Sequence, residues 1–470
     1  MTEPGWASLL PPLIAIVLAI VTRQVIPSLF AGIWLGFWLL GGLNPFPALA
    51  AAIEGSIAVL ASPGDARVIA FALIIGAMIG VIEYAGGVRG FVRTMMERQW
   101  VDSGTKAQWL AWGTGIVVFI ESNLTLLVAG SVSRPLFDRF RISRERLAYL
   151  IDSTSAPICI LIPLNAWGAF NLGLLGGTEV EDPLGVFVAA IGLNFYALAA
   201  VLLAALSIRF GFAFGPMGRA DARTAGGDLL WPDATPMVDP RLLQDEEADS
   251  GQGQARTMVL PIAALVVMVP FGLWVTGDGN LAAGTGSVAV LWAVLTGLAV
   301  AWLLALRAGH SVDDLMQVSL RGAGALLPVA IILLLALALG SVTRELGTGA
   351  FLAQVVGAHV PGLLLPALVF LVGAFTAFAI GSSWGTFAIM IPIAIPLALN
   401  LDLPPALMLA AALSGGVFGD HASPISDTTV VASMAAATDH IDHVRTQLPF
   451  ALTAAAAALV GFLVAGALVA

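Results

Sequence analysis

The stretch "GVFGDHASPISDTTVVASM" (416–434) lies in one of the most apolar parts of the chain. It contains two acids, Asp420 and Asp427, together with His421 and Pro424. Proline lacks a backbone N–H donor and disfavours the α conformation in the residue before it, so Pro424 predicts a break in a helix. The question is what two acids at such a break would bind.

The composition places this break inside a membrane. Of the 470 residues, 59% are hydrophobic and 11% are charged, and the mean hydropathy is +0.95. A soluble domain carries about 25% charged residues, and repeated apolar runs of ~20 residues are typical of membrane helices. We therefore predict an all-α polytopic membrane protein whose partner is the lipid bilayer. The net charge of −10 argues against a nucleic-acid partner.

Short stretches of the chain recur at a nearly constant spacing. "GGVRGFV" (86–92) resembles "LGTGAFL" (346–352), and "ESNLT" (121–125) resembles "GSSWG" (381–385). "SAPICILIP" (155–163) likewise resembles "SPISDTTVV" (423–431), so that Pro157 matches Pro424. Duplicated halves are common in secondary transporters. We predict a first repeat over 1–212, a second over 257–470, and between them a flexible cytoplasmic loop over 213–256, which is polar and rich in Gly, Pro and Asp.

Basic residues predict that the two repeats are inverted. Arg89, Arg93, Arg98 and Lys106 precede the apolar segment 107–138; Arg134 lies near its end, and four further arginines follow it within a few residues. Because basic residues collect on the cytoplasmic side, both ends of this segment are expected there, as in a re-entrant hairpin. The matching segment 361–400 is followed by no nearby basic residue and is predicted to enter from the opposite side. This topology leaves only Arg67 and Arg344 outside and places both termini outside.

Each predicted hairpin is followed by a predicted broken helix, over 145–175 with Pro157 and over 404–436 with Pro424. Unpaired backbone groups inside a bilayer cost several kcal/mol each, so such breaks occur inside protein or beside a polar cavity. We therefore expect two hairpin tips and two breaks to converge near the membrane midplane. The candidate cation- and proton-binding residues are Glu121, Ser122, Asn123, Thr125, Asp152, Ser155, Ser382, Ser383, Thr386, Asp420, His421, Ser423, Ser426, Asp427, Thr428 and Thr429.

The charge of these residues predicts the ligand. They include four carboxylates and neither lysine nor arginine, so Na⁺ and H⁺ are the natural counter-ions. We place Na⁺ at Asp420, Asp427, Asn123 and Ser382, with the acids binding metal ion and proton in turn. No cofactor is expected beyond these transported ions.

Other roles remain open for several of these side chains. Asp152, Asp420 and Asp427 could instead cap or stabilise helices, with Asp420 as the N-cap of the second half-helix. His421 could be a hydrogen-bonded partner of an acid rather than a proton carrier. His440 and His443, in "DHIDHVR" (439–445), are interpreted as interface or gate residues.

Three motifs resemble one family. "GDHASPISDTT" (419–429), "GSSWGTFAIMIPIAIP" (381–396) and "DHIDHVRTQLPFAL" (439–452) are similar to the NhaC-type Na⁺/H⁺ antiporters of the ion-transporter superfamily. The resemblance covers roughly 60–470. Two positions depart from its pattern: Ala422 stands where cysteine is frequent, and Ser382 where threonine is frequent.

The resemblance implies inverted repeats, a transport domain sliding against a scaffold, and a homodimer, here expected in the inner membrane of a prokaryote. It also implies Na⁺/H⁺ exchange for some members and carboxylate or amino-acid transport for others. We predict a secondary transporter, not an enzyme, that exchanges Na⁺ (or Li⁺ or K⁺) for H⁺ by alternating access. The alternative is the same fold transporting malate, lactate or an amino acid with Na⁺ or H⁺. A channel fits less well, because it needs an open pore with weak binding.

Overall fold

The computed structural model describes residues 5–22, 24–41, 44–97, 101–119, 121–236, 253–280 and 284–469. Arg98, whose charge was used to predict the topology, and residues 237–252 of the predicted loop lie outside these ranges. Within them the regular structure is entirely helical. Eight described helices are long and apolar enough to cross a membrane, so the protein is a multi-pass membrane protein and the predicted fold class is confirmed at this level.

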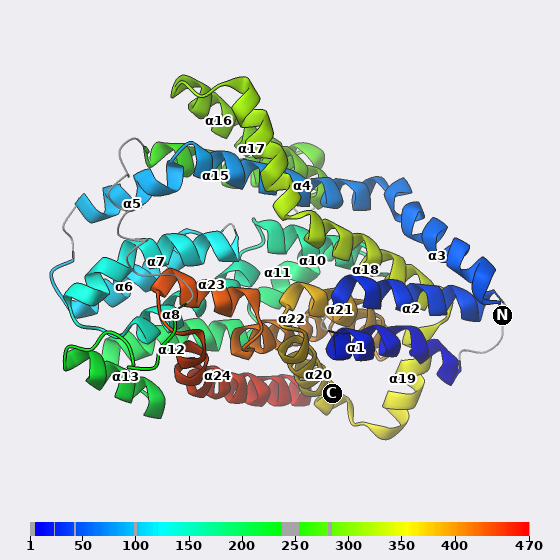
Figure 1. The fold of residues 1–470 in the computed structure, drawn as a ribbon. Coiled ribbons are helices and arrows are strands. Elements are labelled where there is room, and N and C mark those ends of the chain that lie inside the picture. The colour runs from blue at the N-terminus through cyan, green and yellow to red at the C-terminus, as the bar shows by residue number, and fades with distance from the viewer. Residues whose placement is uncertain are drawn as a thin grey trace.

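The helices run side by side along the length of the molecule (Figure 1). The first half contains α1 (Leu10–Thr22), α2 (Val25–Leu40), α3 (Pro45–Ala58), α4 (Pro63–Tyr84), α5 (Gly87–Glu97), α6 (Gly104–Val117), α7 (Ser122–Arg139), α8 (Arg144–Asp152), α9 (Ala156–Leu161), α10 (Ala166–Gly176), α11 (Pro183–Ile191) and α12 (Phe195–Phe210). The rest contains α13 (Gly215–Ala225), α15 (Arg256–Thr276), α16 (Gly286–Arg307), α17 (Val312–Ala325), α18 (Leu327–Glu345), α19 (Thr348–His359), α20 (Leu365–Ile380), α21 (Ser383–Asn400), α22 (Pro405–Ala422), α23 (Asp427–Ala436) and α24 (His440–Val469).

Helix starts recur along the chain in the two halves. The starts of α7 and α21, Ser122 and Ser383, are 261 residues apart, and so are the starts of α8 and α22, Arg144 and Pro405. The starts of α5 and α19 and of α6 and α20 have the same separation, and α7 and α21 are both 18 residues long. This register supports a duplicated order of elements. The orientation of each repeat in a membrane stays a prediction.

The first broken helix is interrupted twice rather than once. Residues 153–155 separate α8 from α9, and residues 162–165 separate α9 from α10. Pro157 lies in the first turn of α9 rather than in the gap, because the missing N–H of a proline has no intrahelical partner there. The second gap ends at Asn165, whose side chain accepts a hydrogen bond from Gly168 N at 2.9 Å and so caps α10.

The predicted loop 213–256 is in part a helix. Gly215–Ala225 forms α13, which docks on the start of α8 through buried ion pairs. Arg146 of α8 lies 2.5 Å from Asp221 of α13, and Glu145 of α8 lies 2.7 Å from Arg223 of α13. The sequence predicted a loop here because the segment is polar. The ion pairs that hold α13 could not be predicted, because their partners lie far away along the chain.

The segment after α13 also contacts the turn before α24. Thr235 donates to Asp439 Oδ2 through its backbone N at 2.9 Å and its hydroxyl at 3.2 Å. Partial burial raises the pKa of the Asp439 carboxyl, but hydrogen bonds from the backbone N–H groups of Thr235 and Asp442 outweigh it. The net pKa of Asp439 therefore lies below its ordinary value.

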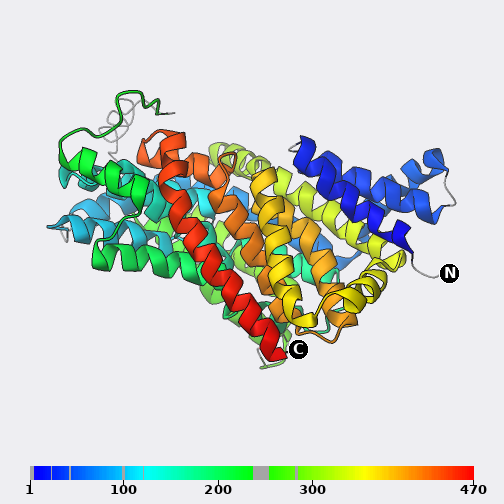
Figure 2. The same ribbon diagram turned by 90° about the horizontal axis from the view of Figure 1, so that it is seen from below.

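Close packing fixes the second broken helix against its hairpin. A Cβ added at Gly415 of α22 would lie 2.4 Å from Phe370 O of α20, and one at Gly419 would lie 2.4 Å from Ala374 O. Small residues allow such backbone approach between membrane helices. The long helix α24 runs diagonally across one face (Figure 2) and contacts α8, α12, α20 and α22. These contacts bring α24 to both broken helices.

Candidate functional site

The first helix break carries a fully buried acid. Asp152 is the last residue of α8, and its carboxylate Oδ2 accepts a hydrogen bond from Gln447 Nε2 at 2.7 Å. His443 Nε2 lies 3.3 Å from the same oxygen, and His421 Nε2 lies 4.0 Å from it. Gln447 Nε2 also donates to His421 O at 2.6 Å, which ties α24 to α22. The environment of Asp152 is therefore made of nitrogen groups from two later helices.

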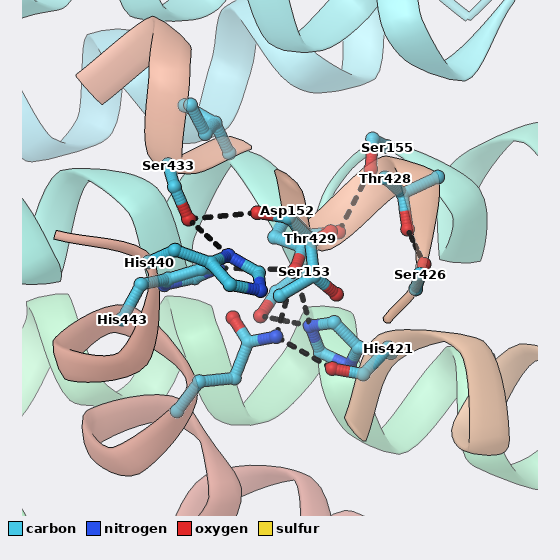
Figure 3. Close-up of polar contacts among 12 residues, drawn as sticks. Asp152, Ser153, Ser155, His421, Ser426, Thr428, Thr429, Ser433, His440 and His443 are labelled. Carbon is cyan, nitrogen blue, oxygen red and sulfur yellow. Dashed lines mark hydrogen bonds and ion pairs between the residues drawn. The ribbon is translucent and has the colours of Figure 1, made fainter. Parts of the chain in front are cut away.

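His421 has partners on both ring nitrogens. Tyr196 Oη lies 2.6 Å from Nδ1, and Ser153 Oγ lies 3.3 Å from Nε2. Figure 3 shows His421 and His443 on either side of the Asp152–Ser153 backbone. These contacts favour the prediction that His421 is a hydrogen-bonded partner rather than a proton carrier.

The second helix break holds Asp420 in a cluster of hydroxyls. Ser426 donates to Asp420 Oδ1 at 2.5 Å, and Ser383 donates to Oδ2 at 2.9 Å. Ser426 Oγ also lies 2.9 Å from Thr428 Oγ1, and Thr429 donates to the Asp420 backbone oxygen at 3.4 Å. Hydroxyl donors thus satisfy both carboxylate oxygens, and no cationic side chain of the described residues takes part.

Asp427 begins α23 and faces the tip of the first hairpin. The side chain of Asn123 and the charges of Glu121, Asp420 and Asp152 lie close enough to its carboxylate to interact with it electrostatically. The oxygen Oδ1 of Asn123 is buried and has no hydrogen-bond partner among the described residues. An unpaired amide oxygen next to a carboxylate is suited to a hard cation, which prefers oxygen ligands.

Neither Asp152 nor Asp420 is a helix cap, so that alternative is wrong for both. Asp420 lies inside α22, and α23 begins after Ser426, which makes no side-chain cap bond. Asp152 ends α8, and the residue before α9 is Ser155, also without a cap bond. Both carboxylates are instead used in contacts between distant segments.

His443 is buried against Asp152 rather than exposed at a water boundary, so it is not an interface residue in this structure. Its interpretation as a gate residue stays a prediction. Sequence reasoning also missed Gln447 and Tyr196. Gln447 lies within the quoted motif 439–452, so the resemblance of this motif to the family could have identified Gln447 as a candidate site residue. Tyr196 lies in the apolar run of α12, and only its hydroxyl distinguished it.

A profile of the Na⁺/H⁺ antiporter family matches residues 168–467. The chain belongs to this family. The resemblance inferred from the three motifs is therefore confirmed.

The chain is similar in sequence to two further proteins and in fold to one solved structure. An uncharacterized protein of Haemophilus influenzae is 33% identical over 490 residues, which cover 98% of this chain and 90% of the relative. A Bacillus subtilis protein named malate-2H⁺/Na⁺-lactate antiporter is 32% identical over 183 residues, which cover 36% of this chain and 37% of the relative. The solved YdaH transporter of Alcanivorax borkumensis matches 89% of this chain and 88% of its own with a TM-score of 0.62. At 14% identity, this likeness shows the fold alone.

No described lysine or arginine of this antiporter-family chain forms an ion pair with Asp152, Asp420 or Asp427. The buried arginines of α8 pair instead at its other end, Arg144 with Asp138 and Arg146 with Asp221. The described residues also contain no group of three or more His, Cys, Asp and Glu side chains arranged to hold a metal ion. A cation in this site would therefore depend on hydroxyl and amide oxygens as well as the acids.

Several predicted site residues of the antiporter are held by backbone or helix-cap bonds. Glu121 caps α7 by accepting from Leu124 N at 2.8 Å, and Ser382 caps α21 by accepting from Gly385 N at 3.3 Å. Backbone carbonyls accept the hydroxyls of Thr125, Ser155, Thr386 and Ser423, and Ser122 donates to Glu121 Oε1 at 3.1 Å. These bonds shape the ends of the helices, whereas Ser383 and Ser426 donate to the Asp420 carboxylate directly.

Proposed function

We propose that the protein is a secondary transporter that exchanges Na⁺, Li⁺ or K⁺ for H⁺ by alternating access. One observation carries the proposal: two buried carboxylates, on Asp152 and Asp420, stand among hydroxyl, amide and imidazole groups without a described lysine or arginine partner. The carboxylate of Asp427, which is exposed, adds a third negative charge at the second break. Buried acids need a cation or a proton as counter-charge. Membership of the Na⁺/H⁺ antiporter family supports the same conclusion.

The proposed cation ligands are oxygens from both repeats. Asp420 and Asp427 supply carboxylates, Asn123 supplies its unpaired Oδ1, and Ser382 supplies a hydroxyl at the tip of the second hairpin. Ser383, next to Ser382, orients the Asp420 carboxylate. Residues about 66–208 and 324–469 would move against a scaffold of 1–43 and 257–306, so that the site opens to each side in turn.

The test uses purified protein in liposomes that contain a pH-sensitive dye. Adding Na⁺ or Li⁺ outside should drive proton movement, and Asp427→Asn should reduce the rate by on the order of a hundredfold, because it removes a charged ligand. Asp402→Asn is the matched control, since Asp402 is exposed in the turn after α21. An Asp427→Asn variant with the wild-type rate would overturn the proposal.

A second candidate function follows from the Bacillus subtilis relative, whose name gives malate and lactate as its solutes. In that case the acids and hydroxyls would bind a coupling Na⁺ or H⁺, and the organic solute would lie beside them. The same liposomes distinguish the two functions. The second candidate would be favoured if Na⁺, Li⁺ and K⁺ caused no proton movement while the liposomes took up labelled malate, lactate or arginine.

The oligomer and the membrane orientation are part of the proposal. We propose a homodimer in the inner membrane of a prokaryote, with both termini outside and the segment 213–256 in the cytoplasm. The distribution of basic residues along the chain supports this orientation.

A further inference from the structure

The acids at the two helix breaks contact different kinds of chemical group. Asp420, at the second break, receives hydrogen bonds only from hydroxyls among the described residues. Asp152, at the first break, faces a glutamine amide and two imidazoles. No described hydrogen bond joins Asp152 or His443 to the proposed Na⁺ ligands. The two acids therefore lie in chemically distinct environments.

His443 differs from the other histidines nearby in having a nitrogen without a partner. Its Nε2 lies 3.3 Å from Asp152 Oδ2, whereas Nδ1 is buried and makes no hydrogen bond with the described residues. His440, one turn earlier on α24, uses both nitrogens: Nδ1 lies 3.1 Å from Ser433 Oγ and Nε2 lies 2.7 Å from Pro424 O. His421 is likewise engaged on both nitrogens.

Further unpaired polar atoms belong to residues near His443 in sequence or in space. Asp152 Oδ1, Gln447 Oε1 and Thr438 Oγ1 are buried without a hydrogen-bond partner among the described residues. Most buried polar atoms are hydrogen-bonded, so an exception calls for a water, an ion or a chemical role. Here the unpaired atoms come from the Asp152 cluster and from the turn that leads into α24.

We propose that Asp152 and His443 form a proton-binding site separate from the cation site at Asp420 and Asp427. This inference rests on the proposed exchange function and assigns its proton step. In the empty state, His443 Nε2–H donates to the Asp152 carboxylate and Nδ1 carries a lone pair. An incoming proton binds at Nδ1, so the ring becomes a cation beside the carboxylate, and the same proton leaves from Nδ1.

The charged and titratable neighbours of this pair set how it communicates with the cation site. From α8 and α12 they are Tyr149 and Tyr196, and from α22 and α23 they are His421, Asp420 and Asp427. The charges of α13 are paired elsewhere, Asp221 with Arg146 and Arg223 with Glu145. Cation binding at Asp420 and Asp427 therefore acts on Asp152 through charge and through Gln447, which donates to both Asp152 and His421 O, so the two sites are coupled without a shared cation ligand.

The first experiment compares histidine variants in the liposome assay. His443→Gln keeps an N–H donor for Asp152 but removes the proton-accepting Nδ1. It should flatten the pH dependence of the maximal exchange rate between about pH 5 and pH 8, and change the KM for Na⁺ by less than about twofold. The matched control His440→Gln should leave the pH profile in place. Asn123→Ala should raise the KM for Na⁺ about tenfold without moving the pH profile.

The second experiment needs no transported cation. Purified wild-type protein and the variants are titrated between about pH 8 and pH 5 without Na⁺, and the bound protons are counted. His443→Gln should bind about one proton fewer than wild type, and His440→Gln should match wild type, whichever solute the protein carries. Unfolding curves check that each variant is folded, and Asp152→Asn, which keeps the side-chain shape, should reproduce the loss.

Two results would overturn the proton-site assignment. One is a His443→Gln variant that raises the KM for Na⁺ while keeping the wild-type pH profile. The other is a folded His443→Gln variant that binds as many protons as wild type. If liposomes show no cation exchange but the titration shows the missing proton, the proposed function fails while the proton site stands.

Discussion

The two helix breaks of this protein follow helices whose starts are 261 residues apart, but they have different surroundings. The break between α22 and α23 surrounds Asp420 with serine and threonine hydroxyls. The break between α8 and α9 places Asp152 against His443 and Gln447. An oxygen-rich cluster is suited to a hard cation, and a carboxylate beside an imidazole is suited to a proton.

The difference arises after the point where the two halves stop matching. Helix starts keep the same spacing of 261 residues as far as α8 and α22, but α9 has six residues and is followed by α10, whereas α23 is followed by the 30-residue α24. His443 and Gln447 both come from α24. The helix α24, which belongs to the second half alone, therefore gives Asp152 surroundings that differ from those of Asp420.

The largest expected effect separates the two acids directly. Asp420→Asn should weaken Na⁺ binding by about 3 kcal/mol, or roughly a hundredfold, because it removes a charged ligand. Asp152→Asn should change Na⁺ affinity by less than about threefold while removing the coupled proton movement. Equilibrium Na⁺ binding to the purified variants measures the first effect, and the dye assay measures the second. If Asp420→Asn and Asp152→Asn lost Na⁺ affinity equally, the two acids would not have the different roles assigned to them.

A smaller effect concerns how each hairpin contacts its break. A Cβ at Gly381 would lie 2.7 Å from Ile425 O, and one at Gly115 would lie 2.0 Å from Thr154 Oγ1. Each alanine variant should destabilise the fold by about 1–3 kcal/mol, with Gly381→Ala the more severe because its φ of +73° disfavours a side chain. Thermal unfolding in detergent measures this.

The control for the glycine variants is Gly113→Ala in α6, where no atom lies within 4 Å of the added Cβ. It should stabilise the helix by about 0.5–1 kcal/mol. If Gly115→Ala and Gly381→Ala were as stable as this control, the hairpins would not pack on the breaks as described.

A still smaller effect distinguishes two adjacent serines at the second hairpin tip. Ser383→Ala should cost the Asp420 cluster a hydrogen bond to a charged group, about 1.5–3 kcal/mol, and should raise the KM for Na⁺. Ser382→Ala removes the cap of α21 and should cost about 1 kcal/mol of stability. Its effect on KM tests whether Ser382 is also a ligand: an unchanged KM would remove it from the proposed set.

The smallest expected effect concerns the partner of His421. Tyr196→Phe removes the hydroxyl 2.6 Å from His421 Nδ1 and should lower the free energy of unfolding by about 1 kcal/mol. The pH profile of exchange should stay close to that of wild type, because His421 is assigned a positioning role. A flattened profile, like that expected for His443→Gln, would move the proton site to His421.

Much of the fold followed from local signals in the sequence. Apolar runs indicated membrane helices, and the recurrence of short motifs indicated duplicated halves. The break near Pro424 lies in the gap that its chemistry predicts, whereas Pro157 marks the first turn of a helix, because proline is equally compatible with both positions. The helix α13 could not be predicted, because its stability depends on Glu145 and Arg146, some 70 residues earlier in the chain.

The sequence by itself determined that this is a multi-pass membrane protein of the Na⁺/H⁺ antiporter family with acids at a helix break, because apolar runs, proline chemistry and the motif around Asp420 are local properties. Tertiary structure alone decided what each acid contacts. Asp152 meets Gln447 across 295 residues of chain, and no local pattern encodes such a contact. It exists because α8, α22 and α24 pack together and a buried carboxylate must find a donor.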